Sequence, residues 1–151
     1  MYWTNGGVGE TIRWAQMDGT NPAVLVAGLK NPHGITVDFD TSRLYWTQAD
    51  KVSSSSLRGE NINTIVTLPE IHLWGVATLQ GRVFWGTDIS FKLQSSTKTG
   101  EDVRILYEGV NRNHQVVAAT SNLPRNRTNH CQYYNCPRIS VLTATCAHCV
   151  D

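Results

Sequence analysis

Cysteine is absent from the first 130 residues of this 151-residue chain, and no apolar run in it approaches the length of a membrane span. A transmembrane helix needs about 20 consecutive apolar residues. The 13 basic and 12 acidic side chains nearly cancel, which leaves a formal net charge of +1. That balance argues against the broad positive surface of a nucleic-acid binder or a polybasic membrane binder. No secretory signal opens the chain, because Met1 leads directly into Tyr2-Trp3-Thr4, so we expect the chain to begin inside a fold.

Motifs for catalysis are absent as well. The sequence has no nucleophile elbow, no glycine-rich loop that would cradle a phosphate, and no paired acidic residues arranged for acid–base catalysis. We therefore predict that the protein is not an enzyme and uses neither a cofactor nor a metal ion. The 40% hydrophobic content and the five tryptophans predict a folded core rather than a disordered chain.

The four cysteines all fall in the last 21 residues. They are Cys131, Cys136, Cys146 and Cys149. This clustering predicts a small separate module that disulfides stabilise because its own core is too small. Four cysteines allow three pairings, and the sequence does not choose among them.

The context of these cysteines favours a secreted or lumenal protein. The sequon Asn126-Arg127-Thr128 predicts N-glycosylation of Asn126 in a polar linker beside the cysteine cluster. A zinc site is the alternative for the cysteines, since Cys146-Ala147-His148-Cys149 has ligand-like spacing and His130 is near. We favour disulfides, because an extracellular setting is oxidising.

An internal repeat of about forty residues organises the rest of the chain. Three landmarks recur in the same phase: an aromatic pair, a turn glycine and a short apolar stretch. The aromatic pairs end at Trp3, Trp46 and Trp85, which are 43 and 39 residues apart. The turn glycines Gly19, Gly59 and Gly100 are 40 and 41 residues apart. The apolar stretches begin at His33, Trp74 and His114. A repeat of this period is typical of a propeller blade.

Each repeat divides into four short strands. In the middle repeat the expected strands are 34–39, 43–48, 51–57 and 62–68, separated by turn residues. Four strands per forty residues predict an all-β fold of propeller blades rather than a β-sandwich, which is the alternative for strands of this spacing. We expect the serine run Ser53–Ser56 to form a polar, solvent-facing third strand.

The motifs Tyr2-Trp3-Thr4 and Tyr45-Trp46-Thr47, with Pro32-His33-Gly34-Ile35 between them, resemble the YWTD repeats of the low-density lipoprotein receptor family. The resemblance covers about residues 1–120. It implies a six-bladed β-propeller, of which this chain carries about three four-stranded blades from the C-terminal half. The aspartate that completes the family motif, and that ties neighbouring blades in the family, is replaced here by Asn5 and Gln48.

The resemblance extends to the tail. In the family an epidermal-growth-factor-like module follows the propeller, and residues 131–151 resemble a truncated version with four of the six cysteines, after a linker at 121–130. Arg127, Thr128 and Asn129 stand where a calcium-binding version carries acidic residues, so we expect no calcium there.

The resemblance also implies a function. We expect an extracellular ligand-binding module of a receptor-related protein of the endocytic or Wnt co-receptor type, located on the outer side of the cell membrane or secreted. The alternative is a nidogen-like matrix protein. Expected partners are protein or lipoprotein ligands and the remaining blades of a parent that is a single-pass membrane protein; nucleic acid is not expected.

The candidate ligand-binding residues are His33, Trp74 and His114, which open the first strand of successive repeats. First strands line the channel of a propeller, and in the family ligand peptides dock near the channel. Aromatic side chains are enriched at binding hot spots. The competing interpretation is that the three residues pack locally between blades. No carboxylate opens any of these strands, which argues against a metal-dependent hydrolase.

Overall fold

The chain is all-β in the computed structural model, which describes residues 1–69, 71–88, 90–109, 116, 139–142 and 147–150. It divides into two compact units, Met1–Ala119 and Thr120–Asp151. No helix occurs in the described residues, so none of them forms a helix that could cross a membrane.

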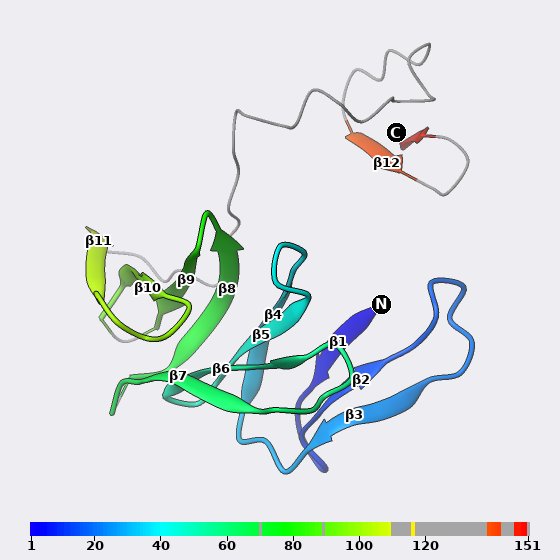
Figure 1. Ribbon diagram of the computed structural model, residues 1–151, viewed down its shortest axis with the longest axis horizontal. Helices are drawn as coiled ribbons and strands as arrows, with labels where there is room; N and C mark the ends of the chain where they lie inside the picture. Colours follow the sequence, from blue (N-terminus) through cyan, green and yellow to red (C-terminus); the bar gives the residue numbers. More distant parts are fainter. Residues whose placement is uncertain (70, 89, 110–115, 117–138, 143–146, 151) are drawn as a thin grey trace. The chain divides into compact units, whose positions relative to one another are not determined.

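The first unit contains three antiparallel sheets, each with its strands in chain order (Figure 1). Blade 1 consists of β1 (Tyr2–Asn5), β2 (Thr11–Trp14) and β3 (Ala23–Ala27). Blade 2 consists of β4 (Pro32–Asp38), β5 (Arg43–Gln48), β6 (Lys51–Ser56) and β7 (Asn63–Thr67). Blade 3 consists of β8 (Leu73–Leu79), β9 (Arg82–Thr87), β10 (Lys92–Thr97) and β11 (Arg104–Glu108).

The all-β, four-stranded blade predicted from the repeat is confirmed. In the middle repeat every strand boundary lies within two residues of the expected one. Blade 1 shows three strands in its described residues, as expected for the later strands of a blade. The further first-type strand expected around Gln115 lies outside the described residues, apart from Val116.

Successive blades pack face to face, because alternate residues of a strand point to opposite faces of its sheet. In β5, Leu44 and Trp46 join Ile12 and Val26 of blade 1 in one buried cluster. Tyr45, between them, joins a second cluster with blade 3. The second cluster comprises Tyr45, Val52, Val66, Leu73, Val76, Val83 and Trp85. A blade in the middle of the stack is therefore apolar on both faces.

The prediction that the serine run faces solvent is wrong. Ser53, Ser54 and Ser55 are at most 1% exposed, because the third strand lies inside a sheet that is covered on both faces. The small serine side chains leave room for neighbouring side chains, and their hydroxyls can form hydrogen bonds with these neighbours. The guanidinium of Arg43 donates to Ser54 Oγ at 3.0 Å, which satisfies a polar atom that burial would otherwise leave unpaired.

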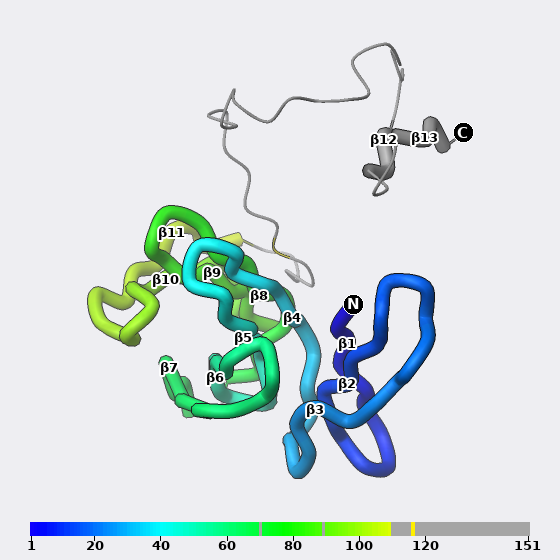
Figure 2. Tube along the Cα trace, turned by 45° about the vertical axis from the view of Figure 1, so that its right-hand side comes forward, coloured from blue at the N-terminus to red at the C-terminus, as the bar shows by residue number. Residues whose placement is uncertain are grey.

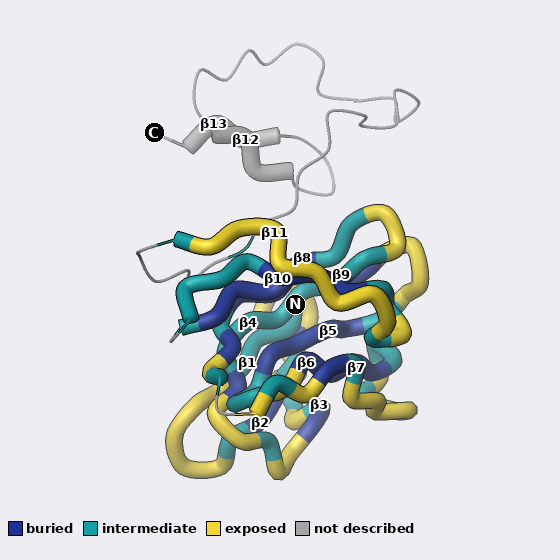
Figure 3. The backbone as a smooth tube through the Cα atoms, turned by 90° about the vertical axis from the view of Figure 1, so that its left-hand side faces the viewer, coloured by how far each residue is buried: buried dark blue, intermediate teal, exposed yellow. Residues whose placement is uncertain are grey.

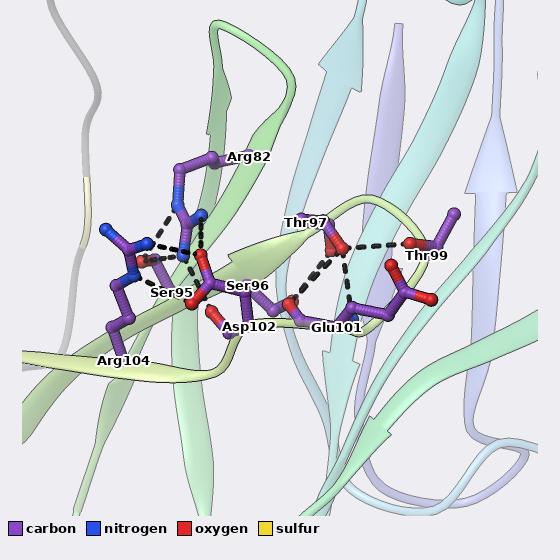
Figure 4. Close-up of polar contacts among 8 residues, drawn as sticks. All are labelled: Arg82, Ser95, Ser96, Thr97, Thr99, Glu101, Asp102 and Arg104. Atoms are coloured by element: carbon purple, nitrogen blue, oxygen red, sulfur yellow. Dashed lines mark hydrogen bonds and ion pairs between the residues drawn. The ribbon is translucent and has the colours of Figure 1, made fainter.

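Blade 3 repeats this arginine–serine contact and extends it into the outer turn (Figure 4). Arg82 donates to Ser95 Oγ at 3.0 Å and forms an ion pair of 2.9 Å with Asp102. Arg104 contacts the same carboxylate at 2.8 Å. Hydrogen bonds from Arg104 and then Arg82 lower the pKa of Asp102. The contacts fix the turn between β10 and β11.

The turn glycines serve the packing of blades as well as the turns. Gly59 and Gly100 have φ of +79° and +88°, a region in which residues with a Cβ are strained. A Cβ on Gly59 would lie 2.6 Å from the carbonyl oxygen of Leu25, and one on Gly100 would lie 2.0 Å from that of Ile65. Each turn therefore rests directly on the outer strand of the preceding blade.

The second unit shows one antiparallel hairpin, formed by β12 (Ile139–Leu142) and β13 (Ala147–Val150). Cys149 lies in β13 with its backbone opposite Ser140. Cys131, Cys136, Cys146 and the glycosylation site Asn126 lie outside the described residues. The linker at 121–130, the disulfides and the growth-factor-like module stay predictions.

Candidate functional site

The structure brings two of the three predicted site residues together. His33 in β4 and Trp74 in β8 belong to the first strands of blades 2 and 3, which lie side by side (Figure 2). Their rings stack with centroids 4.1 Å apart and planes inclined by 20°. His114, the third predicted residue, lies outside the described residues.

Threonine hydroxyls from the preceding blades bind the backbone carbonyls of both stacked residues. Thr4 of blade 1 donates its hydroxyl to the carbonyl of His33 at 2.7 Å. In the same way Thr47 of blade 2 donates to the carbonyl of Trp74. The backbone that carries each ring is therefore hydrogen-bonded to the preceding blade.

Gly34 permits the close approach of the two strands. A Cβ at this position would lie 2.5 Å from the carbonyl oxygen of Trp74, which real side chains do not tolerate. The Gly34 N–H donates to Thr47 Oγ1 at 2.9 Å, so the same threonine links both strands. The glycine next to the candidate site is thus required by packing.

A groove of about 460 Å³ lies along the stacked pair, and its lining, which is polar and apolar in similar measure, also includes Gly34, Ile35, Gly75, Val76 and Val116. Grooves that combine apolar walls with a few polar groups are the usual form of a ligand site. Among the described residues, no three His, Cys, Asp or Glu side chains gather as they would around a metal ion. The groove offers a ring face and imidazole nitrogens, which suit stacking and hydrogen bonding with a ligand side chain.

The imidazole of His33 is held toward its neutral form. Burial against Trp74 lowers the pKa of His33 below its usual 6.5, and the nearby His72 lowers it further. Asp88 and Glu10 act in the opposite direction without reversing the shift. A neutral imidazole presents one donor and one acceptor to the groove.

Comparison with known proteins shows which proteins this chain is similar to. No family model matches the chain. It is 29% identical to the vitellogenin receptor of Solenopsis invicta over 94% of the chain, and 29% identical to the vitellogenin receptor Yl of Drosophila melanogaster over 70%. It is 31% identical to the human low-density lipoprotein receptor-related protein 5 over 69% of the chain. The chain belongs to the low-density lipoprotein receptor family. Its YWTD repeats account for the three blades, and it spans at most 8% of the length of these relatives.

A solved structure agrees with the fold of this receptor-family chain. The crystal structure of a nidogen/laminin complex matches 71% of the chain and 43% of its own chain, with a TM-score of 0.65 and 24% identity. At that identity the likeness concerns the fold alone. The match supports the propeller architecture.

Sequence reasoning missed the role of the YWTD threonine in this family member. The tie between blades that the resemblance assigned to the aspartate is made here by Thr4 and Thr47. Gln48, at the aspartate position, accepts from the backbone of Lys30 at 3.4 Å. The only signal in the sequence was that threonine stands unchanged in both complete motifs while the fourth residue varies. Blade 3 has Gly86 at the threonine position, as its pairing register shows.

A buried ion pair between blades was missed too. Lys98, in the outer turn of blade 3, contacts the carboxylate of Asp38 at the end of β4, and Thr41 donates to the same group. The Asp38 side chain is only 6% exposed. Burial acts to raise the pKa of Asp38, but the hydrogen bonds from Lys98 and Thr41 outweigh it and lower the pKa. Asp38 occurs in one repeat only, so the repeat pattern gave no sign of this contact.

Proposed function

We propose that this chain is part of a non-enzymatic, extracellular receptor module that binds a protein ligand at the groove between β4 and β8. The observation that carries the proposal is the stacked pair of His33 and Trp74, which lines a groove with both polar and apolar surface. Aromatic side chains in such grooves supply much of the binding energy of protein interfaces. The relationship to receptors supports a binding role.

The ligand class we favour is a large lipoprotein of the vitellogenin type, taken up by an endocytic receptor. Two of the relatives carry the name vitellogenin receptor, and one of them matches 94% of this chain. The parent would then be a single-pass membrane protein that displays this unit outside the cell. A Wnt co-receptor role is the weaker alternative within the same family.

A nidogen-like matrix role is the second candidate. It is favoured by one observation, the structural match to a nidogen chain solved in complex with laminin. The two candidates differ in the ligand that the same groove would hold. A binding measurement with both ligands separates them.

The test uses the full 151-residue chain, immobilised through its C-terminus, and purified insect vitellogenin as the probe. Laminin and an unrelated serum lipoprotein are tested in parallel. We expect vitellogenin to bind, and Trp74→Ala to weaken that binding at least tenfold, as the loss of a hot-spot aromatic does. His33→Ala is expected to weaken it less, because the Trp74 ring face remains.

The matched control is Phe39→Ala, which removes an exposed ring just beyond the opposite end of β4 from His33. Unchanged binding by Phe39→Ala together with a loss by Trp74→Ala supports the groove. Binding of laminin alone favours the matrix candidate. No binding of any probe, or equal binding by wild type and Trp74→Ala, contradicts the proposed site.

A further inference from the structure

The connection between β3 and β4 leads directly into His33, and its backbone conformation is unusual. Figure 3 shows the strands inside the sheets as mostly buried and the connections between strands as mostly exposed. Asn31 lies in such an exposed connection, with φ of +46°, in the left-handed region that residues other than glycine seldom adopt. Asparagine tolerates this region better than most residues, but the residue before a proline is normally extended, and Pro32 follows. Contacts from outside the connection must therefore hold Asn31 in place.

Two hydrogen bonds hold Asn31, one on each side of its α-carbon. The carboxylate of Glu10, the last residue before β2, accepts the Asn31 N–H at 3.0 Å. The carbonyl of Asn31 accepts the Ala49 N–H at 3.1 Å. Because one bond fixes the N–H and the other fixes the carbonyl, together they fix the direction in which the chain enters β4.

The hydrogen bonds continue from Asn31 to the second ring of the site. The carbonyl of Ala49 accepts the Leu73 N–H at 2.9 Å, and Leu73 directly precedes Trp74. Asn31, Ala49 and Leu73 thus form a series of backbone hydrogen bonds. This series joins the segment before His33 to the segment before Trp74, so the conformation of Asn31 affects the placement of both rings.

The next blade lacks both the carboxylate contact and the unusual conformation. Asp50 is the equivalent of Glu10, because it directly precedes β6, which pairs with β5 as β2 pairs with β1. Within the described residues, the Asp50 side chain accepts no hydrogen bond. His72 is the equivalent of Asn31, since its carbonyl accepts the Asp88 N–H at 2.9 Å, and its φ is not positive. The carboxylate contact therefore occurs at the connection that needs it and is not a general requirement of a blade.

We propose that Glu10 is a positioning residue of the ligand groove, whose carboxylate holds Asn31 in the left-handed conformation that brings the His33 ring onto Trp74. This inference rests on the proposed function, in which the two stacked rings contact a protein ligand. Without the carboxylate, the exposed connection would return to the extended conformation that is usual before proline. Ligand binding would then have to order the connection again.

The charge of Glu10 provides a second sign that it lies close to the site. Burial and then His72 lower the pKa of His33, whereas Asp88 and Glu10 act to raise it. Removing the Glu10 charge should therefore lower the pKa of His33 further. Glu10→Gln separates charge from positioning, because its amide oxygen can still accept the Asn31 N–H. Glu10→Ala removes both the charge and the acceptor.

The first part of the test observes the site by NMR without a ligand. The His33 ring protons, assigned by their absence in His33→Gln, should be shifted upfield by the ring current of Trp74, and the Asn31 amide should be protected from hydrogen exchange. We expect Glu10→Ala to lose most of the shift and the protection, and Glu10→Gln to keep both while the pKa of His33 falls. Asp50→Ala is the matched control and should change none of the three. Circular dichroism checks that every variant keeps the β fold.

The second part measures vitellogenin binding by the same proteins. Glu10→Ala should raise the dissociation constant roughly fivefold, the equivalent of one net hydrogen bond, and Glu10→Gln and Asp50→Ala should leave it nearly unchanged. If the wild type does not bind vitellogenin but the NMR results are as expected, the proposed ligand is wrong and the positioning role is supported.

An unchanged upfield shift in Glu10→Ala, or an equal loss in Glu10→Gln, would overturn the inference. If Glu10→Ala does not keep the β fold, the wild type decides. Rapid exchange of its Asn31 amide would show that the carboxylate does not hold this residue.

Discussion

Thr47 in blade 2 donates its side-chain hydroxyl to the backbone carbonyl of Trp74 in blade 3, and it accepts the N–H of Gly34 at 2.9 Å. One buried hydroxyl thus joins the first strands of two blades directly beneath the candidate ligand site. Thr4 makes the corresponding contact to His33. The position of both stacked rings therefore depends on hydroxyls from the preceding blades.

Replacing Thr47 by valine should destabilise the chain by about 2 kcal/mol, because the Gly34 N–H and the Trp74 carbonyl would both lose the buried Thr47 hydroxyl as their partner while the volume stays nearly the same. Thr47→Ser keeps the hydroxyl and should cost less than half as much. Urea unfolding followed by tryptophan fluorescence measures both values. Equal losses in the two variants would show that packing of the methyl group, and not the hydrogen bonds, matters at this position.

The buried pair of Asp38 and Lys98 should stabilise the contact between blades 2 and 3. Lys98→Met leaves the carboxylate with Thr41 alone and should cost about 3 kcal/mol, as the loss of one partner of a buried pair does. The double variant Asp38→Leu/Lys98→Met should recover most of that loss. Thermal unfolding of the two variants at neutral pH checks this. A double variant as unstable as Lys98→Met would contradict the argument from buried charge.

The sequence predicted the blades well and the contacts between them poorly, for a physical reason. Strand boundaries follow from local alternation and turn residues such as Gly59, which recur once per repeat. The burial of Ser53–Ser55 could not be predicted from their polarity, because it depends on sheets covering both faces of β6. Likewise, Asp38 and Lys98 are 60 residues apart and belong to different blades, and an aspartate stands at the Asp38 position in one repeat only. The proximity of His33 and Trp74 could be predicted from the repeat, since equivalent positions of adjacent blades must be neighbours.

The three turn glycines allow two causes of strain to be separated. Gly19 and Gly59 have nearly the same φ, +83° and +79°, but only Gly59 touches a neighbouring blade within the chain. Gly19→Ala should therefore cost about 1 kcal/mol from the backbone conformation alone. Gly59→Ala should cost clearly more, because its Cβ would meet the Leu25 carbonyl.

Both glycine variants are compared with the wild-type chain under the same conditions. Chemical denaturation gives the free energies of unfolding. If Gly19→Ala and Gly59→Ala have the same effect, the close contact between turn and blade is not energetically important.

Asn126 is predicted to carry an N-linked glycan when the chain is secreted from a eukaryotic cell, because its sequon precedes the cysteine module in a polar segment. Asn126→Gln should then run at a lower mass on a gel, and enzymatic removal of glycans should shift only the wild type. Thr128→Ala, which destroys the sequon without touching the asparagine, is the matched control and should behave like Asn126→Gln. Equal masses for all three proteins would contradict the prediction.

The pKa of His33 makes the stability of the site depend on pH. Burial and His72 lower this pKa in the folded chain, so the unfolded chain binds the proton more readily. Stability should therefore fall as the pH drops below about 6.5, the ordinary value, and should go on falling until His33 itself becomes protonated. His33→Gln should flatten the profile between pH 7.5 and 5.5. His72→Gln should flatten it partly, because it removes the neighbouring charge that lowers the pKa of His33.

The affinity for ligand should also depend on the protonation of His33. Protonation of His33 adds a positive charge beside Trp74 and removes the imidazole acceptor from the groove, so an acidic environment should weaken a ligand that is basic or donates a hydrogen bond there. Vitellogenin binding measured at pH 7.4 and 5.5 tests this, with Phe39→Ala as the control that keeps the histidine. We expect the ratio of the two affinities to shrink in His33→Gln. If His33→Gln retains the full ratio, the proton that governs release binds elsewhere in the receptor.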